Sequence, residues 1–502
     1  MSKFKRYERY KDSGVEWIGE IPEHWGVNKI KFTTYVKGRI GWQGLRADEF
    51  IDEGPYLVTG TDFIDGLVNW GSCYHISMER YNEAPPIQLR ENDLLITKDG
   101  TIGKVAIVKN KPKYAILNSG IFVTRPQNSA YLTEFMYWIL NSQVFNRFIE
   151  YMSLGSTIVH LYQQTFENFS FPITNLKEQK TIVDFLNKKT SEIDDLIADK
   201  EKLIELLQEK RQAVITEAVT KGLNPNVRMK DSGIEWIGEI PEHWDIRRIK
   251  YLANVRNIKA SDSDNDKTYV GLENIESRTG KLLLNRDDEQ QLIGETANIF
   301  KKGDVLFGKL RPYLAKCIIA DFDGRCTSEL LVLRTTTNIL PEYLYFLILS
   351  PKFIDIVNSS TYGAKMPRAS WDFIGNLEIP LPSIKEQEEI VEYLLELTRK
   401  VDELIFDIST QIQKLKEYRQ SLISEAVTGK IDVRDYKDEE MSNLNLIKKV
   451  ERRVSRMKNE TIYLDRDMNQ RFEKEFEAAK KDWEKDKQEY EKQKRDNDKK
   501  QF

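Results

Sequence analysis

The feature that most constrains this chain is a block of fifteen residues that occurs twice. Residues 11–25 read KDSGVEWIGEIPEHW and residues 230–244 read KDSGIEWIGEIPEHW, so fourteen of the fifteen positions are identical and Val15 is replaced by Ile234. The copies begin 219 residues apart, whereas the units of a solenoid repeat every 20–50 residues or so. The sequence therefore predicts two similar halves in tandem.

Length and cysteine content narrow the class of protein. A chain of 502 residues has room for two or three domains with cores of their own. No apolar run approaches the roughly 18 residues that cross a bilayer, and the N-terminus has no apolar segment typical of a secretory signal. Cys73, Cys317 and Cys326 lack CxxC spacing. We expect a cytoplasmic protein in a reducing compartment, with no membrane segment and no metal site.

The distribution of charge says more than its sum. A net charge of −4 is not typical of nucleic-acid-binding domains, which tend to be basic. However, residues 98–113 carry five lysines against one acid, and residues 247–259 carry five basic side chains and no acid. Such clusters can simply be solvated surface. Their presence in both halves favours contact with an anionic partner.

Each half then shows short apolar runs that predict strands, separated by Gly, Asn, Asp and Pro. A helical pattern follows, beginning at Tyr131 in the first half and at Pro341 in the second. Each half thus predicts a mixed α/β domain of about 150 residues. The predicted strands are Tyr56–Thr59, Leu94–Thr97, Lys104–Val108, Ile116–Thr124, Tyr269–Leu272, Asp304–Phe307, Ala315–Ala320 and Glu329–Leu333.

Two long helices follow the two domains. They begin at Leu176 and Ile384, contain no Gly or Pro, and end before Gly222 and Gly429, the residue type favoured just past a helix C-terminus. About 40 residues at 1.5 Å each make a rod roughly 60 Å long. Along alternating steps of four and three from Ile182, seven of ten positions are apolar, and nine of ten are in the second helix.

This spacing is typical of a coiled-coil seam. Lys189, Lys200 and Lys210 interrupt the first seam where the second has Leu397, Ile408 and Tyr418, while Gln411 is the polar position of the second. Because the two seams differ in this way, pairing between the two helices of one chain is favoured over pairing between identical helices of two chains. The alternative is that each amphipathic helix packs separately on its own domain.

The composition changes again after about Lys437. Of the 66 residues from there to the last, 36 are charged, and Phe476, Trp483 and Tyr490 recur every seven residues. A helix with an aromatic stripe and a partly disordered tail are both compatible with this pattern. The predicted organisation is a first domain at 1–175, a helix at 176–222, a second domain at 223–383, a helix at 384–430 and a charged tail at 437–502.

The chain shows no familiar catalytic pattern. His24 and His243 belong to the repeated blocks, where a structural role is favoured, and His75 and His160 stand alone without metal-ligand spacing. The segment from Gly303 to Leu310 has the glycine and Gly-Lys spacing of a phosphate loop, but a leucine stands where Ser or Thr holds magnesium, and its interior predicts a strand. We therefore expect a binding protein and not an enzyme.

Several motifs of this chain occur in pairs: W-I-G-x-I-P-x-H-W at Trp17–Trp25 and Trp236–Trp244, helix openings at Leu176–Gln179 and Ile384–Gln387, and helix ends at Arg211–Thr220 and Arg419–Thr428. The first domain also contains NDLLITKDGTIGKVAIV. Together these motifs resemble the DNA-specificity (S) subunit of type I restriction-modification systems, and the resemblance covers residues 7 to about 436 but not the charged tail.

The resemblance implies a fold and a function. The expected fold is α/β: two mixed α/β target-recognition domains in pseudo-two-fold tandem, separated by two long helices that form an antiparallel coiled coil. The chain would be the non-catalytic subunit that reads a bipartite asymmetric target in double-stranded DNA. It would position two methyltransferase subunits and the restriction (motor-nuclease) subunits, and those partners would use S-adenosylmethionine, ATP and Mg. A coiled-coil scaffold without DNA readout stays open, favoured by the acidic net charge, whereas a single-chain nuclease or methyltransferase lacks its motifs.

Basic residues beside glycine turns, together with one threonine, are the candidate DNA contacts, within base-recognition regions at about 26–170 and 245–378. They are Lys98, Thr101, Lys104, Lys309, Arg311, Lys365 and Arg368. Basic side chains there can neutralise phosphates, or they can be strand-end residues that face water. The repeated blocks and helix ends are the candidate partner surface, although the tryptophans can instead be core residues. The residues are Trp17, Trp25, Trp236, Trp244, Glu217 and Glu425.

Overall fold

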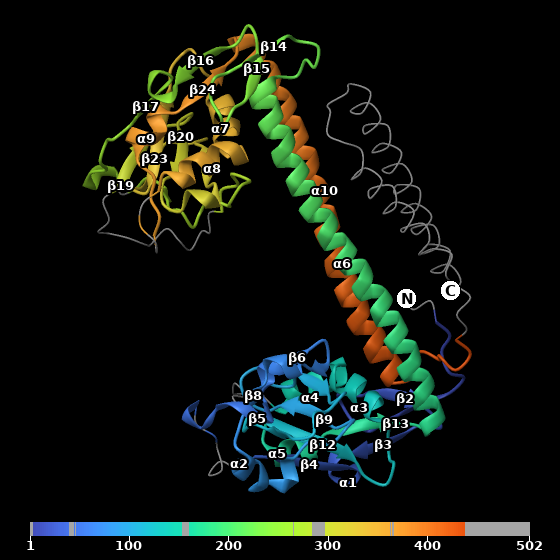
Figure 1. The fold of residues 1–502 in the computed structure, drawn as a ribbon. Helices are drawn as coiled ribbons and strands as arrows, with labels where there is room; N and C mark the ends of the chain where they lie inside the picture. The colour runs from blue at the N-terminus through green and yellow to red at the C-terminus, as the bar shows by residue number, and fades with distance from the viewer. Residues whose placement is uncertain are drawn as a thin grey trace. The chain divides into compact units, whose positions relative to one another are not determined.

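The computed structural model describes residues 4–39, 45, 47–152, 160–264, 266–283, 297–361, 363 and 366–436. The predicted tail at 437–502 and the candidate Lys365 lie outside these residues. The described chain forms two compact units, the first from residues 4–202 and 408–436 and the second from residues 203–407 (Figure 1).

The first unit is built on two sheets. The six-stranded sheet has the order β4-β12-β9-β10-β7-β6, and the three-stranded sheet has the order β11-β5-β8. In chain order these strands are β4 Thr34–Gly38, β5 Ile51–Val58, β6 Phe63–Ile64, β7 Leu67–Val68, β8 Tyr74–His75, β9 Leu94–Thr97, β10 Val105–Ile107, β11 Ala115–Leu117 and β12 Ile121–Pro126. The inward side chains of both sheets share one apolar core, in which Leu57, Leu95 and Val123 are fully buried.

Helices and a terminal strand pair complete the first unit. Helix α3 packs against β10, and β13 pairs antiparallel with β3. The elements are β3 Gly26–Lys29, α1 Ile30–Thr33, α2 Met78–Asn82, α3 Thr133–Leu140, α4 Gln143–Met152, α5 Gln163–Glu167 and β13 Ser170–Ile173.

The second unit repeats this plan with fewer strands. A four-stranded sheet has the order β17-β23-β20-β21, and a three-stranded sheet has the order β18-β22-β19. The strands are β16 Asp245–Arg248, β17 Ala253–Val255, β18 Tyr269–Val270, β19 Ala297–Phe300, β20 Val305–Gly308, β21 Cys317–Ile319, β22 Gly324–Thr327, β23 Leu330–Thr335 and β24 Glu378–Leu381. The helices are α7 Pro341–Leu349, α8 Pro351–Ser359 and α9 Trp371–Asn376.

The order β4-β12-β9-β10 in the first unit corresponds to β17-β23-β20-β21 in the second. The third strand of each order, β9 in the first unit and β20 in the second, pairs antiparallel with both of its neighbours. The predicted mixed α/β class and tandem organisation are confirmed. The interior of the segment that resembles a phosphate loop is a buried strand, β20, as its apolar residues predicted.

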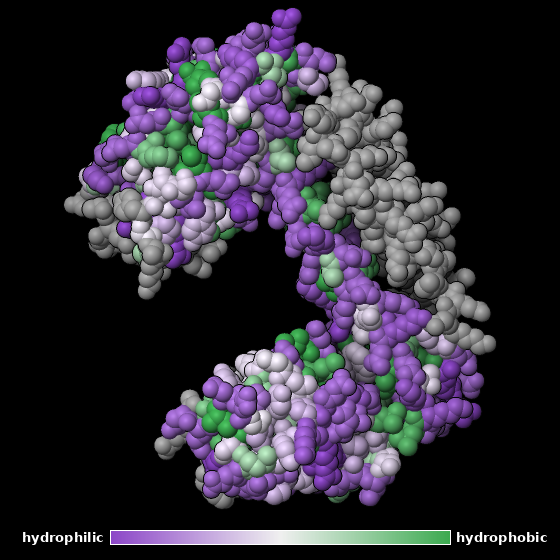
Figure 2. All heavy atoms as spheres, viewed as in Figure 1, coloured by the Kyte–Doolittle hydropathy of each residue, from purple (hydrophilic) through white to green (hydrophobic). Residues whose placement is uncertain are grey.

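The long helices are α6 Leu176–Lys221 and α10 Ile384–Val427, with their predicted glycine ends. Gly222 and Gly429 have φ of +75° and +67°, the left-handed conformation that glycine adopts most easily. In the face shown in Figure 2, the exposed surface of these helices is mostly hydrophilic. Among the described residues, no helix is long and apolar enough to cross a membrane.

The two helices run antiparallel within each unit. In the first unit Arg419 donates to both carboxylate oxygens of Asp194 at 2.8 and 3.0 Å, and Lys200 Nζ donates to Gln411 Oε1 at 2.7 Å. Residue numbers in α10 therefore decrease as the numbers of the residues that they contact in α6 increase. In the second unit Arg211 lies 3.7 Å from Asp402. The predicted pairing of the two helices is confirmed, and the polar interruptions Lys200 and Gln411 satisfy each other.

Candidate partner-docking and DNA-binding surfaces

The repeated blocks fold into two hairpins of the same register. In the first unit β1 Tyr10–Asp12 pairs with β2 Glu20–Pro22, and in the second β14 Met229–Asp231 pairs with β15 Glu239–Pro241. Glycines with positive φ, at +71° and +74° in the first hairpin and +71° and +77° in the second, form the turns. A shared backbone geometry thus accounts for part of the sequence identity.

The first block is fixed to the start of α6 by Glu178. Trp25 Nε1 donates to Glu178 Oε1 at 3.2 Å, the Tyr7 hydroxyl donates to the same oxygen at 2.7 Å, and His24 Nε2 lies 3.1 Å from Oε2. Burial would raise the pKa of the Glu178 carboxyl, but hydrogen bonds from Thr174, Tyr7, Trp25 and His24 outweigh burial and hold it below its ordinary value. An ionised carboxylate therefore holds the block to the helix.

The second block repeats this arrangement at the start of α10. Trp244 Nε1 donates to Glu386 Oε1 at 3.2 Å, and His243 Nε2 lies 2.7 Å from the same atom. Burial alone would raise the pKa of Glu386, yet hydrogen bonds from His243, Ser383 and Trp244 lower it. The structural role expected for both histidines is confirmed. Both glutamates lie in the Lys-Glu-Gln helix openings, but no sequence pattern indicates this role for them.

Each block also contacts the end of the other long helix. A Cβ added at Gly429 would lie 2.5 Å from Pro22 in the first unit, and one at Gly222 would lie 3.1 Å from Trp244 in the second. Trp25 and Trp244 are 0% and 2% exposed. These two tryptophans are core residues, the alternative that the sequence left open, and direct contact with a partner is not available to their side chains.

The other candidate partner residues lie nearer the surface. In the first unit Trp17 and Glu425 line a hollow of about 140 Å³, together with Arg147 and Ser424. Trp17 is half-buried, and its Nε1 donates to the Ser170 carbonyl at 2.9 Å. The structure thus brings together two candidates that are 408 residues apart in sequence.

In the second unit the corresponding candidates, Trp236 and Glu217, are both half-buried. Trp236 packs edge-on against Phe353, with ring centroids 6.1 Å apart. Burial raises the pKa of the Glu217 carboxyl, and nearby Lys221 opposes that shift. Both side chains therefore keep some accessible surface beside the second block.

The first group of candidate DNA contacts lies on the turn after β9. Gly100 and Gly103 have φ of +67° and +84° and form the turn, on which Thr101 and Lys104 are exposed. Lys98 differs, because only 13% of its side chain is exposed and its Nζ lies 5.4 Å from the centroid of the Phe122 ring. The low exposure of Lys98 therefore disfavours a phosphate contact there, whereas Thr101 and Lys104 are accessible to DNA.

In the second unit the backbones of three further candidates, Lys309, Arg311 and Arg368, come together; Lys365 lies outside the described residues. The Ala369 amide donates to the Lys309 carbonyl at 2.9 Å, and the Arg311 amide donates to the Pro367 carbonyl at 2.8 Å. Arg368 donates from Nε and Nη2 to the Glu329 carboxylate at 3.1 and 2.9 Å.

Lys309, Arg311 and Arg368 therefore share one surface, and Arg368 is already paired. Arg311 is exposed, with a left-handed φ of +51°.

Corresponding positions in the two units carry different side chains. An isolated bridge joins Asp99 to His160 in the first unit, and another joins Leu310 to Arg368 in the second. His160 contacts the Asp99 carboxylate, so it occupies the place of Arg368. No local motif indicates a role for His160, although it lies 208 residues before Arg368, the offset that also separates the starts of the two long helices.

These features define a protein with two copies of one α/β domain. The family model described as the type I restriction modification DNA specificity domain matches residues 45–206 and again 241–414. These matches cover more than half of the chain, which therefore belongs to this family. Family membership favours DNA recognition over a scaffold without DNA readout.

Curated relatives support the same family assignment, and a solved structure shares the fold. The chain is 25% identical over 432 residues to the type I restriction enzyme MjaVIII specificity subunit of Methanocaldococcus jannaschii, covering 83% of this chain and 95% of that one. It is 22% identical over 440 residues to the EcoKI specificity subunit of Escherichia coli K12, covering 82% and 90%. A solved chain from work on assembly and conformational transition of the type I R-M system has a TM-score of 0.61 at 15% identity, covering 82% and 99%, and shows that the fold is shared.

Proposed function

We propose that this chain reads double-stranded DNA and catalyses no reaction itself, with each α/β domain binding one half of a bipartite asymmetric target. The observation that carries the proposal is the duplicated specificity domain, in which one backbone frame presents different side chains. Asp99 with His160 stands where the second unit has Leu310 with Arg368. Different side chains on equivalent frames would select different base pairs.

The proposed partners follow from the repeated blocks. Two copies of one surface suit two copies of one partner, as in symmetric assemblies. Two adenine-methyltransferase subunits are the proposed partners at these surfaces, with restriction subunits joining the complex. S-adenosylmethionine, ATP and Mg would be used by those subunits, in the cytoplasm. Methylation mapping in cells that carry the chain with its methyltransferase tests the whole proposal, and a genome without a methylated two-part motif would contradict it.

Lys104 provides a test of phosphate contact. Unlike Lys98 it is exposed; its Nζ donates to the Gly60 carbonyl at 3.2 Å and lies 5.9 Å from the centroid of the Phe63 ring. Lys104→Ala should weaken binding to all duplexes alike and lower the slope of log K against log salt by about one. Lys98→Ala is the matched control, expected to leave the slope unchanged. Fluorescence anisotropy of the complex over a salt series measures both, and an unchanged slope for Lys104→Ala would remove it as a contact.

Stoichiometry provides a second test. Native mass spectrometry of the co-expressed subunits should give one copy of this chain with two methyltransferase subunits. Because Glu425 lines the surface hollow of the first unit, Glu425→Arg should leave a complex with one methyltransferase. A stable one-to-one complex of the unaltered proteins would contradict the prediction.

A further inference from the structure

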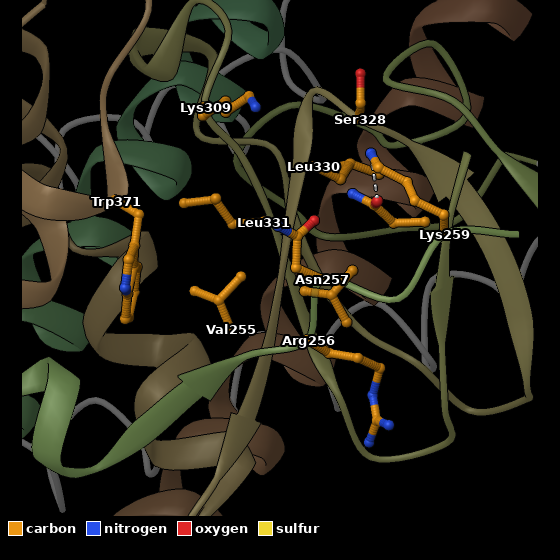
Figure 3. Close-up of a pocket in the computed structure, with 11 residues that line it drawn as sticks. Val255, Arg256, Asn257, Lys259, Lys309, Ser328, Leu330, Leu331 and Trp371 are labelled. Carbon is orange, nitrogen blue, oxygen red and sulfur yellow. Dashed lines mark hydrogen bonds between the residues drawn. The ribbon is translucent and has the colours of Figure 1, made fainter. Parts of the chain in front are cut away.

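The second unit contains a hollow of about 420 Å³ beside the converging DNA candidates (Figure 3). Trp371 lies on one side of it and faces the side chains of Val255 and Leu331, so that these three residues give the hollow apolar walls. Asn257 and Lys309 contribute polar groups to the same hollow. An aromatic and aliphatic wall beside an amide and an ammonium group has the chemistry to bind a base and its phosphate.

The polar groups differ in whether they have partners. Arg256 Nε donates to Asp304 Oδ2 at 2.9 Å, and Lys259 Nζ donates to Asn298 Oδ1 at 3.0 Å. Among residues that the structure describes, the side chains of Asn257 and Lys309 make no hydrogen bond or ion pair. These two groups are therefore available to a ligand.

The first unit fills the corresponding space. Phe122 pairs with Gly38 across β12 and β4, and a Cβ added at Gly38 would lie 2.9 Å from the Phe122 ring. Lys98, which follows β9 as Lys309 follows β20, is held over that ring. A large aromatic side chain, a glycine and an engaged lysine thus close this place in the first unit.

The register of the second unit assigns the counterparts. Leu331 of β23 occupies the position of Phe122 of β12. The residue after each is a valine, and these valines pair with equivalent leucines, Leu306 of β20 and Leu95 of β9. Val255 of β17 corresponds to Val36 of β4, because they pair with equivalent residues, Leu333 and Thr124. Asn257 and Gly38 each lie two residues further along the chain and therefore also correspond. The smaller leucine leaves the space open, and asparagine replaces the glycine that the phenylalanine requires. Among the described residues, these replacements account for the open space in the second unit.

Trp371 marks a further difference. It lies 208 residues after Gln163, whose Nε2 donates to the Val36 carbonyl at 3.2 Å in the first unit. The second unit has an indole at that place instead of an amide bound to the backbone, and Trp371 is half-buried. The exchange adds an apolar surface on which a methyl group or a base can pack.

We propose that this hollow reads an A·T base pair in the half-site bound by the second unit. The Asn257 amide would bond N7 and N6 of adenine, the pairing that asparagine geometry favours, and the apolar wall would contact the thymine methyl group. Lys309 would neutralise a neighbouring phosphate. The inference rests on the proposed DNA-reading function and names the residues that specify one of its base pairs.

Methylation mapping of the intact system tests Asn257. Asn257→Ala should relax one A·T position of a single half-site, with a tenfold to hundredfold loss of discrimination, about that of one bidentate contact. Asn254→Ala is the matched control, because Asn254 is exposed on β17 but its side chain points to the other face of the strand. An Asn257→Ala motif identical to that of the unaltered chain would overturn the inference. If the unaltered chain gave no bipartite motif, the proposed function itself would fail.

Two further variants separate reading from folding. Leu331→Phe combined with Asn257→Gly restores the phenylalanine–glycine pair of the first unit, so it should unfold at a similar temperature yet lose the A·T preference. Lys309→Ala should lower the salt slope of DNA binding by about one, and Lys302→Ala, at the other end of β20, should not. A folded double variant that retains the A·T preference, or a Lys309→Ala slope equal to that of Lys302→Ala, would overturn the inference.

Discussion

Glu178→Ala is expected to lower the free energy of unfolding of the first unit by about 3–5 kcal/mol, the usual effect of removing one partner from a buried charged network. The Glu178 side chain is 4% exposed, and its carboxylate accepts hydrogen bonds from the buried Trp25 indole and the Tyr7 hydroxyl. Alanine leaves both donors without this acceptor. It also releases the first block from the start of α6, so protection from hydrogen exchange should fall in both segments.

Urea unfolding followed by hydrogen exchange at residues 176–186 measures this effect within one unit, because two compact units can unfold separately. Asp184→Ala is the control. It breaks an exposed Lys180–Asp184 pair on the same helix and should cost at most about 0.5 kcal/mol. Glu386→Ala should cost less than Glu178→Ala, because 31% of the Glu386 side chain is exposed. A loss at Glu178 no greater than at Asp184 would mean that the carboxylate does not hold the block.

The same carboxylate makes stability depend on pH. Since the folded pKa of Glu178 lies below its ordinary value, its stabilisation is fully present above the unfolded value, about 4.3. It is lost as the pH falls through the folded pKa. Glu178→Gln does not titrate there, so its unfolding free energy should change less steeply below about pH 4.3. Equal slopes for the variant and the unaltered chain would show that Glu178 does not contribute this acid sensitivity.

Local pattern was sufficient to predict the regular elements. The strand expected at Leu94–Thr97 has those bounds, and α6 begins at Leu176 as expected. The apolar run from Ile116 to Thr124 is two strands, because the chain turns at Gly120 between β11 and β12. Periodicity identified the apolar run, but only the pairing of β11 with β5 and of β12 with β9 separates it into two sheets.

The candidate site was harder to predict, because its contacts join distant parts of the chain. Lys98 is basic and beside a glycine turn, as a phosphate contact should be, yet Phe122 of a neighbouring strand holds its ammonium group. The open hollow depends on Leu331, Asn257 and Trp371 together, and no local pattern relates them. The offset of 208 residues between the two halves is sufficient to identify Trp371 as the counterpart of Gln163, and Arg368 as the counterpart of His160. It could not have shown what lies around them.

Lengthening both long helices by four residues is expected to widen the gap between the two half-sites by about one or two base pairs. The helices pair antiparallel in both units, through Lys200 with Gln411 in the first and Arg211 with Asp402 in the second. If they space the two readers, four residues at 1.5 Å each add about 6 Å, against 3.4 Å along the DNA axis per base pair. Insertions after Lys202 and after Thr410 lie opposite each other and preserve both sets of pairs.

Methylation mapping should then show unchanged bases in each half-site and a longer gap between them, because neither recognition domain is altered. The control inserts four residues after Lys202 alone. That change displaces one helix past the other by about one turn, so either the first-unit pair of Lys200 with Gln411 or the second-unit pair of Arg211 with Asp402 must break, and methylation of every target should fall. Four alanine substitutions at exposed helix positions, which add no length, should leave the motif as it is. A doubly lengthened chain that still methylates the original motif would show that the helices do not set the spacing, even if each domain reads its half-site as proposed.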